Sequence, residues 1–369
     1  MGETSEIDAY IAAANIPNVR FVRVSPTFRY RQTGYGFLGT FIFYRQYRRY
    51  QKDVLEVARK IHSEDPFDVV HYLGPIGFRE PGELWKLPCP YIWGPIGGMA
   101  PPDMNMLKAL PGLKSKMYFI LKNICNSVQI HSFRVKKALR ESDMVLACSG
   151  ETKDIITRKL GIPQAKVIYK PQNCIKRLSP LNGEKFKDEK IQLVWVGNIE
   201  PGKMLHLALR CLAAAKSRQS YVLNVLGDGS QEESCRKMAD ASGLGASVIW
   251  HGRQSRERCF EIMDKSHLLF LTSMYDVNPT VVWEAMSMCV PVLSTASKGL
   301  NDFLNPENSF LIDNSSCEKV CEDFTEMLDY IAENRNILQE KAQYLDSYRH
   351  LFTWDRRQEF FLRLYDAIR

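Results

Sequence analysis

The chain lacks any uninterrupted run of about eighteen apolar residues, the length that a membrane-spanning helix requires. It opens with a polar, acidic segment, Met1-Gly-Glu-Thr-Ser, which has none of the features of a secretory signal peptide. We therefore expect a cytoplasmic protein without a membrane-spanning helix. The length of 369 residues is enough for two α/β domains.

Paired cysteine motifs are also missing. The ten cysteines are scattered through the chain without a CxxC pair, and no His accompanies Cys317 and Cys321, which lie four positions apart. Neither a zinc site nor a disulfide framework is indicated, because both normally show regular cysteine spacing. We expect ten reduced thiols and no bound metal or cofactor.

Two long stretches contain no acidic residue. Eight basic residues lie between Asp8 and Asp53, and eight more lie between Asp103 and Glu141, interleaved with aromatic and aliphatic side chains. Basic amphipathic segments of this kind suit an anionic membrane surface, so residues 20–52 and 104–140 are candidates for peripheral membrane binding. The alternative is a solvated face above a buried stripe. Nucleic acid is not expected, since no recognised binding motif accompanies the charge.

Apolar segments that alternate with helical patterns predict an α/β protein with doubly wound parallel sheets. A polar stretch from Leu178 to Glu189 predicts the boundary between a first domain, residues 1–177, and a second, residues 178–350, with a terminal helix over 351–369. The predicted strands are 18–24, 67–72, 90–93, 143–147, 166–169, 191–197, 221–226, 247–252, 268–271 and 290–294, and the main predicted helices are 40–62, 104–140, 204–216, 279–288 and 354–369.

One glycine pattern has the form of a dinucleotide fingerprint. Gly34, Gly36 and Gly39 make a GxGxxG, but about nine residues separate it from the preceding predicted strand. The fingerprint must follow its strand at once, because its glycines form the turn into the helix. We interpret this segment as a flexible loop.

The stretch from Met274 to Leu304 is the most informative part of the chain. Asn278 is a good helix N-cap and Pro279 suits a first helical turn, so a helix is predicted from about residue 279. The free N–H groups of a helix start bind anions, and the Thr280 hydroxyl adds a further donor. Glu284, a turn further in, can accept hydrogen bonds from ribose hydroxyls. This combination suits a sugar nucleotide.

These residues resemble the E-x7-E region of the family 4 (group 1) retaining glycosyltransferases, which have the GT-B fold. Glu284-Ala285-Met286 and Pro291-Val292 match its usual form, and Asp276 stands at the first Glu, eight positions before Glu284. Cys289 stands where Gly is usual. The resemblance implies two Rossmann-like domains that face a cleft, with a nucleotide sugar bound to the second.

Three further segments of the second domain carry the same resemblance. Gly197 and Asn198 open a segment like the family's G-R-x-x-x-x-K, in which Lys203 holds the Lys position and Asn198 replaces the Arg. Gly227 begins a G-D-G turn, and Arg253 follows a strand that approaches the nucleotide base in the family. The resemblance thus implies that Lys203 neutralises the donor diphosphate, with one positive charge fewer than usual.

On the first domain, FDVVH and WGPIGG resemble a bacterial subgroup of these enzymes, in which both segments line the acceptor side of the cleft. They contain His71, Gly94, Gly97 and Gly98. No catalytic His carries over, because the Gly-Pro loop occupies the place where relatives outside the subgroup have one. His71 either orients a sugar or is a strand-end His bonded to the backbone.

The resemblance implies a hexosyltransferase that moves a sugar from a nucleotide sugar to a saccharide or lipid-linked saccharide in bacterial surface polysaccharide synthesis. Glu284 would hold the ribose and Asp276 would contact the transferred sugar, with no metal required. The opening strand and Gly-rich loop of the GT-B first domain have no counterpart here. We therefore expect an N-truncated first domain, in a chain that is a fragment or has a mis-called start; the alternative is a protein that tolerates the loss.

Two alternatives stay open. The missing opening segment, Asn198 and Asp276 would also suit a non-catalytic GT-B protein that binds a sugar nucleotide or a partner. The basic helices could instead make the chain a membrane-surface scaffold. A sugar-nucleotide epimerase shares the fold, but the sequence shows no catalytic acids and His clusters of the kind expected for one.

Overall fold

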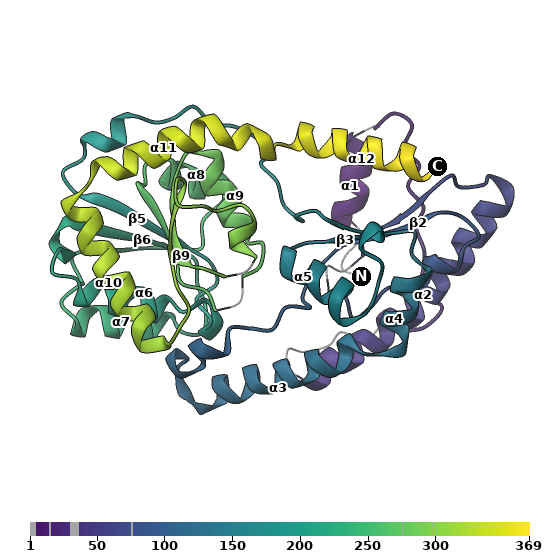
Figure 1. Cartoon of the computed structure of the whole chain (residues 1–369), viewed down its shortest axis with the longest axis horizontal. Coiled ribbons are helices and arrows are strands. Elements are labelled where there is room, and N and C mark those ends of the chain that lie inside the picture. Colours follow the sequence, from purple (N-terminus) through teal and green to yellow (C-terminus); the bar gives the residue numbers. More distant parts are fainter. Residues whose placement is uncertain (1–4, 15, 30–36, 75–76, 275, 298) are drawn as a thin grey trace. The chain divides into compact units, whose positions relative to one another are not determined.

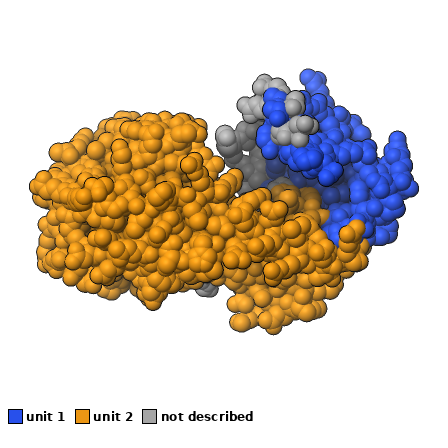
Figure 2. Space-filling model, turned by 90° about the horizontal axis from the view of Figure 1, so that it is seen from above, with its two compact units in different colours: residues 1–70, 82–89 blue, residues 71–81, 90–369 orange. Residues whose placement is uncertain are grey.

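The computed structural model describes the whole chain except residues 1–4, 15, 30–36, 75–76, 275 and 298. It divides into two compact units, which Figure 2 distinguishes by colour. Unit 1 comprises residues 1–70 and 82–89, and unit 2 comprises residues 71–81 and 90–369. Gly34 and Gly36 of the predicted loop lie outside the described residues.

Unit 1 contains two α-helices, α1 (Ser5–Ala14) and α2 (Phe37–Glu64), and a 3-10 turn, η1 (Leu84–Lys86). The helix predicted over 40–62 is confirmed. The strand predicted over 18–24 is wrong, because this segment is irregular and its apolar side chains are about half exposed. A little further on, Thr27 donates to the Asp53 carboxylate of α2 through its N–H (2.9 Å) and its hydroxyl (2.8 Å). Side-chain bonds therefore hold this segment where a sheet ladder was expected.

The first sheet has four strands in the order β1-β2-β3-β4, and β2, β3 and β4 are parallel. Among the described residues, no strand precedes Val70. Ser149 caps α5 by accepting from Thr152 N–H at 3.1 Å. The elements are β1 (Val70–Tyr72), β2 (Tyr91–Ile96), η2 (Met104–Ala109), α3 (Gly112–Ile130), α4 (Phe133–Glu141), β3 (Met144–Ala147), α5 (Gly150–Asp154) and β4 (Val167–Tyr169).

The second sheet has six parallel strands in the order β10-β9-β8-β5-β6-β7, which confirms the predicted doubly wound topology. The sequence analysis did not predict β10. The strands are β5 (Ile191–Val196), β6 (Tyr221–Leu226), β7 (Val248–Gly252), β8 (Leu268–Leu271), β9 (Val292–Thr295) and β10 (Ser309–Ile312). The helices are α6 (Leu205–Ala214), α7 (Glu232–Ala241), α8 (Arg256–Asp264), α9 (Thr280–Ser287), α10 (Cys317–Glu333) and α11 (Asn336–Tyr348).

Helices cover both faces of this sheet, with α6, α7 and α10 on one side and α8, α9 and α11 on the other (Figure 1). Successive strand residues point to opposite faces, so a strand covered on both sides is apolar throughout. In β5, Leu193 and Trp195 face the core that contains α6 and α10, whereas Val194 faces the core that contains α9 and α11. This is why the sequence shows continuous apolar runs here.

The core beneath α6 and α10 also takes in residues from much earlier in the chain. Met106, Ala109 and Leu110, from η2 and the residue after it, are buried in this core together with Phe119 of α3. Asn105 donates to Asn314 O at 2.7 Å, and the ring Nε2 of His206 bonds to Ala109 O at 2.7 Å. One end of α3 is thereby fixed to the second sheet.

The last helix, α12 (Trp354–Ile368), leads back to the first sheet (Figure 1). Ile175 N–H donates to Phe352 O and Trp354 N–H donates to Ile175 O, both at 2.9 Å. Tyr365 then contacts His71 of β1, with 2.7 Å between its hydroxyl and the His Nδ1. The predicted domain boundary near residue 178 remains a prediction.

Short helical turns complete the described structure. None of its helices combines the length and the apolar character needed to cross a membrane, within the residues described. The turns are η3 (Ile155–Lys159), a π-helical turn, and the 3-10 turns η4 (Gln164–Lys166), η5 (Glu184–Lys187), η6 (Pro201–Lys203), η7 (Arg218–Ser220), η8 (Leu300–Asp302) and η9 (Arg349–Phe352).

Gly227, just after β6, has no room for a side chain. It follows β6 with φ at +136°, and a Cβ added there would lie 1.9 Å from Gly197 O. Both the positive φ and the close backbone approach require glycine.

Replacing Gly227 by Ala should therefore lower the thermal unfolding midpoint by several degrees, corresponding to a loss of about 1–3 kcal/mol. Gly183→Ala is the matched control, because an added Cβ there meets nothing within 4 Å. Differential scanning calorimetry of both variants checks this. Equal midpoints would show that the β6 end can relax to admit a side chain.

Candidate functional site

The loops that follow β5 and β8 meet at the point where the strand order of the second sheet reverses. β5 pairs with both β6 and β8, and the chain runs outward from this centre in both directions. Ligands of doubly wound sheets bind outside the carboxyl ends of the strands at such a switch point. The two loops contain most of the residues that the sequence analysis selected.

Lys203 and Asp276 come together across these two loops. The Lys203 Nζ donates to both carboxylate oxygens of Asp276, at 2.7 and 2.6 Å. Lys203 is about one third exposed and Asp276 is mostly covered. An ammonium group that solvent reaches, held by one carboxylate, can still turn toward an anionic ligand.

The backbone around Lys203 is fixed by its neighbours. The residue ends η6, and the next residue, Met204, is fully buried with a left-handed φ of 55°. The Thr272 hydroxyl, just after β8, donates to Lys203 O at 3.2 Å and to Met204 O at 2.9 Å. The loops after β5 and β8 are thus joined by side-chain-to-main-chain hydrogen bonds as well as by the ion pair.

The first turn after β5 lies against the turn after β6. Gly197 N–H donates to Leu226 O at 3.0 Å, and its carbonyl oxygen is the atom that leaves no room for a side chain at Gly227. Asn198 is exposed, and its carbonyl accepts from Glu200 N–H at 2.7 Å. Gly197 and Gly227 are therefore adjacent, and Asn198 presents its amide to solvent beside them.

The N-cap of helix α9 lies one residue later than predicted. Asn278 as N-cap is wrong, because Pro279 holds that position and no side chain caps the helix. The Asn278 Oδ1 instead accepts from Asn173 N–H at 3.2 Å and from Trp283 Nε1–H at 3.1 Å. Asn278 thus bonds to residues outside the start of the helix and does not cap it. Thr280, the first helical residue, is exposed.

Glu284 lies on α9 with an unexpected partner. The Arg256 Nη2 of α8 donates to Glu284 Oε1 at 2.8 Å. Burial raises the pKa of the Glu284 carboxyl, while Arg256 acts in the opposite direction. Arg253, which the sequence analysis selected, does not reach this carboxylate within the described contacts and pairs with Asp228 at 3.1 Å.

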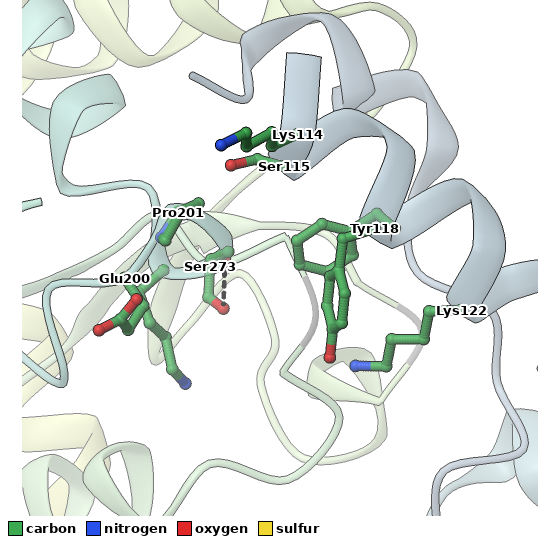
Figure 3. Close-up of a pocket in the computed structure, with 10 residues that line it drawn as sticks. Lys114, Ser115, Tyr118, Lys122, Glu200, Pro201 and Ser273 are labelled. Carbon is green, nitrogen blue, oxygen red and sulfur yellow. Dashed lines mark hydrogen bonds between the residues drawn. The ribbon is translucent and has the colours of Figure 1, made fainter. Parts of the chain in front are cut away.

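A pocket of about 520 Å³ opens beside Lys203. Figure 3 shows Lys114, Ser115, Tyr118 and Lys122 of α3 along one wall, with the loop after β5 and Ser273 across from them. The Ser273 hydroxyl donates to Gly202 O at 3.3 Å, and this bond joins two residues on that side of the pocket. The pocket therefore joins a helix from the first half of the chain to the loops of the second sheet.

The charge of this pocket is mainly positive. Three lysines line it, Lys114, Lys122 and Lys203, against one acid, Glu200. Burial and then the nearby Arg79 lower the pKa of Lys122, and Asp276 opposes both by its negative charge. Lys122 and Lys203 thus both lie within the field of Asp276, and together they favour an anionic ligand.

The predicted acceptor-side residues gather at β1 and β2. The His71 Nε2 bonds to Gly94 O at 2.8 Å and its Nδ1 to Tyr365, so its ring is held on both sides. Burial lowers the pKa of His71. This fits the interpretation of His71 as a strand-end His bonded to the backbone. Gly97 O accepts from Phe78 N–H at 3.2 Å, and Gly98 has a φ of +77°.

Within the described part of the chain, no group of three or more His, Cys, Asp or Glu side chains is arranged to hold a metal ion. The positive charge near the switch point comes instead from lysine and arginine side chains.

Sequence reasoning missed Arg256 and the pocket wall of α3. Arg256 is 28 positions from Glu284, so no local spacing joins them. The α3 wall did leave a signal, because Lys114, Tyr118 and Lys122 recur every four residues and thus share one side of a helix.

The chain is similar to known glycosyltransferases in sequence and in fold. The family described as glycosyl transferases group 1 matches residues 181–344. A lipopolysaccharide 1,6-galactosyltransferase of Salmonella typhimurium is 24% identical over 163 residues, 43% of this chain. The match spans only 44% of that transferase's own length.

Solved structures are similar over more of the chain. The lipopolysaccharide outer core galactosyltransferase WaaB, in its apo form, matches 83% of this chain and 76% of its own, with a TM-score of 0.55 at 18% identity. Anabaena Alr3699/HepE in complex with UDP matches 86% of this chain and 82% of its own, with a TM-score of 0.58 at 13% identity. The chain therefore has the GT-B fold, and its residues 181–344 match the group 1 glycosyltransferase family.

Proposed function

We propose that this protein is a retaining glycosyltransferase that moves a sugar from a nucleoside-diphosphate sugar to a saccharide or lipid-linked saccharide in surface polysaccharide synthesis. The observation that carries the proposal is the Lys203–Asp276 pair at the switch point of the family-matched domain. A cation beside a carboxylate is what the departing diphosphate and the transferred sugar would each need.

Each site residue has a role in this proposal. Lys203 and the first turn of α9 at Thr280 would balance the diphosphate charge, and Glu284 would accept from the ribose hydroxyls, steadied by Arg256. Asp276 would contact a hydroxyl of the transferred sugar. The departing diphosphate would help to take the acceptor proton, with attack on the face that it leaves. The lysines supply the positive charge, so the proposal includes no metal or cofactor.

The uridine nucleotide is the first donor class to test, because Alr3699/HepE was solved with UDP. Lys203→Ala and Glu284→Ala should each weaken UDP binding by roughly 1–3 kcal/mol, the range for hydrogen bonds to charged groups. Isothermal titration calorimetry measures this directly. Lys237→Ala is the matched control, since Lys237 also forms a lysine–carboxylate pair, on α7, with an Nζ–Oε1 distance of 2.6 Å.

The same titration with GDP and dTDP shows whether a lack of UDP binding means that the donor has another base or that the protein binds no nucleotide. Binding of one nucleotide that both site variants weaken supports a working donor site. A folded protein that binds none of the three would favour the non-catalytic alternative, as would binding that Lys203→Ala and Glu284→Ala leave unchanged.

Asp276 should behave differently from Lys203. Asp276→Asn removes the carboxylate that holds the Lys203 ammonium, so UDP should bind at least as tightly as to the original protein, while sugar transfer falls at least tenfold. Donor turnover and calorimetry on the same preparation give both quantities. A large loss of UDP affinity in Asp276→Asn would mean that the pair is structural.

We further propose that the protein acts on the cytoplasmic side of a membrane, held there by α3. Leu113, Met117, Leu121, Ile124 and Val128 form what we call the apolar stripe, and each is between 52% and 73% exposed. At 3.6 residues per turn these five positions fall within an arc of about 80°. Lys114 and Lys116 flank the stripe. A narrow apolar face beside lysines suits an anionic lipid surface.

The double variant Leu121→Ser/Ile124→Ser should bind vesicles containing phosphatidylglycerol at least about tenfold more weakly, because it removes most of the apolar area from the middle of the stripe. Vesicle co-sedimentation across a salt series measures the loss. Leu362→Ser on α12 is the matched control, since Leu362 is 55% exposed and Leu121 is 52% exposed. Equal binding by the double variant and the control would rule out the stripe as the lipid contact.

The second acid-free segment, 20–52, contributes to membrane binding in the same proposal through its basic residues. Nucleic acid is no part of it.

A further inference from the structure

Helices α6 and α10 bring two thiols into contact on the side of the second sheet away from α9. The Cys211 S–H of α6 donates to Cys321 Sγ of α10 at a sulfur–sulfur distance of 3.3 Å. A disulfide bond is about 2.05 Å long, so the two sulfurs need to approach by roughly 1.2 Å to join. The pair is unrelated to any of the proposed sugar-nucleotide contacts.

Access to the two sulfurs is unequal. Cys211 is fully buried, whereas Cys321 is partly exposed and lines a pocket of about 490 Å³. A reagent in this pocket would meet Cys321 first, with Cys211 directly behind it. That is the arrangement in which one thiol reacts and a neighbour resolves the product.

Charge favours Cys321 as the reacting sulfur. The hydrogen bond from Cys211 and the nearby Arg210 guanidinium lower the pKa of the Cys321 thiol, against the opposing effects of burial and Glu322. The same contact, together with burial, raises the pKa of Cys211. The charged groups that face the pocket are Lys108 of η2, Arg210 of α6 and Glu318, Glu322 and Glu326 of α10.

We propose that Cys321 and Cys211 form a two-thiol redox site that a hydroperoxide oxidises to a disulfide between α6 and α10. This inference does not rest on the proposed transferase function. In the first step the Cys321 thiolate attacks one peroxide oxygen, the O–O bond breaks, and the other oxygen leaves as hydroxide and takes up a proton to form water. Cys321 is then a sulfenic acid.

In the second step Cys211 attacks Cys321 Sγ. The S–S bond forms, the S–O bond breaks, and the sulfenic oxygen leaves as water with the Cys211 proton. Overall, two thiols give up two electrons and two protons, and one hydrogen peroxide becomes two waters. Any reductant of the thiol class reverses the change by exchange.

Cys317 is a nearby third thiol with a different setting. Its Sγ lies 4.0 Å from the Arg210 Nη2, and its side chain is buried. The 3.3 Å contact selects Cys211 as the partner of Cys321, because no contact of comparable closeness joins Cys317 to either sulfur among the described residues. The pairing is therefore specific and can be tested.

The reduced full-length protein is treated with one equivalent of hydrogen peroxide. Its free thiols should fall by two, and peptide mass spectrometry should find Cys211 joined to Cys321. Cys211→Ser should instead accumulate a Cys321 sulfenic acid that dimedone traps, and Cys321→Ser should show neither product. The oxidation rate should rise with pH through a midpoint below the ordinary thiol value of about 8.5.

Cys125→Ser is the matched control, because Cys125 is also partly exposed but should leave the disulfide and its rate unchanged. Thermal unfolding of each variant confirms that it is folded. The proposal is overturned if Cys321 oxidises no faster than Cys125, if the disulfide joins Cys317, or if Cys211→Ser leaves the yield of disulfide unchanged.

Discussion

The ion pair between Lys203 and Asp276 is the contact around which the second sheet's functional end is arranged. Its two members come from loops that leave neighbouring parallel strands, and those loops are also bonded through Thr272 and the main chain. Because the strand order reverses here, the helices that follow β5 and β8 lie on opposite faces of the sheet. A pocket of about 520 Å³ lies beside the ion pair, between these loops and α3.

The polar groups around this pair differ in how easily their hydrogen bonds can be exchanged for a ligand. Lys203 and Asp276 bond to each other, Glu284 bonds to Arg256, and the Asn278 Oδ1 accepts from both Asn173 and Trp283. A solvent-accessible ion pair can exchange one partner for a ligand at a low cost in free energy. Moving the Asn278 Oδ1 away from the backbone N–H of Asn173 and the indole N–H of Trp283 would leave both donors without a hydrogen-bond partner. The proposed donor site thus combines charged side chains that can change partners with an Asn278 side chain that is held in place.

Much of the second sheet could be predicted from the sequence. The strands β5, β6, β8 and β9 are largely buried on both faces, so the sequence shows them as apolar runs, whereas β7 is partly exposed and β10 was missed. Glycines such as Gly227 mark backbone positions that exclude a side chain. The Lys203 and Asp276 positions followed from a family resemblance, while their contact did not follow from spacing, because 73 residues separate them.

The wrong and missed predictions have a common physical cause. A local sequence pattern carries no information about a partner that is distant in the sequence. Asn278 has the chemistry of a helix cap, but Asn173, 105 positions earlier, uses its oxygen. The segment 18–24 is rich in Val and Phe and was predicted as a strand, yet it joins no sheet ladder among the described residues. Arg256 was missed for the same reason, because its significance depends on Glu284.

The burial of η2 in the core of the second sheet has a consequence for the order in which the protein can fold. Asn105 bonds to a residue 209 positions later, and Met106 and Leu110 pack among side chains of α6 and α10. During synthesis the early segment leaves the ribosome long before its partners exist, so its apolar side chains stay uncovered until α10 is made. Contacts of such high sequence separation slow folding and lengthen the time in which a chain can aggregate. The second sheet can therefore complete its core only near the end of translation, even though one of its packing elements is made in the first third of the chain.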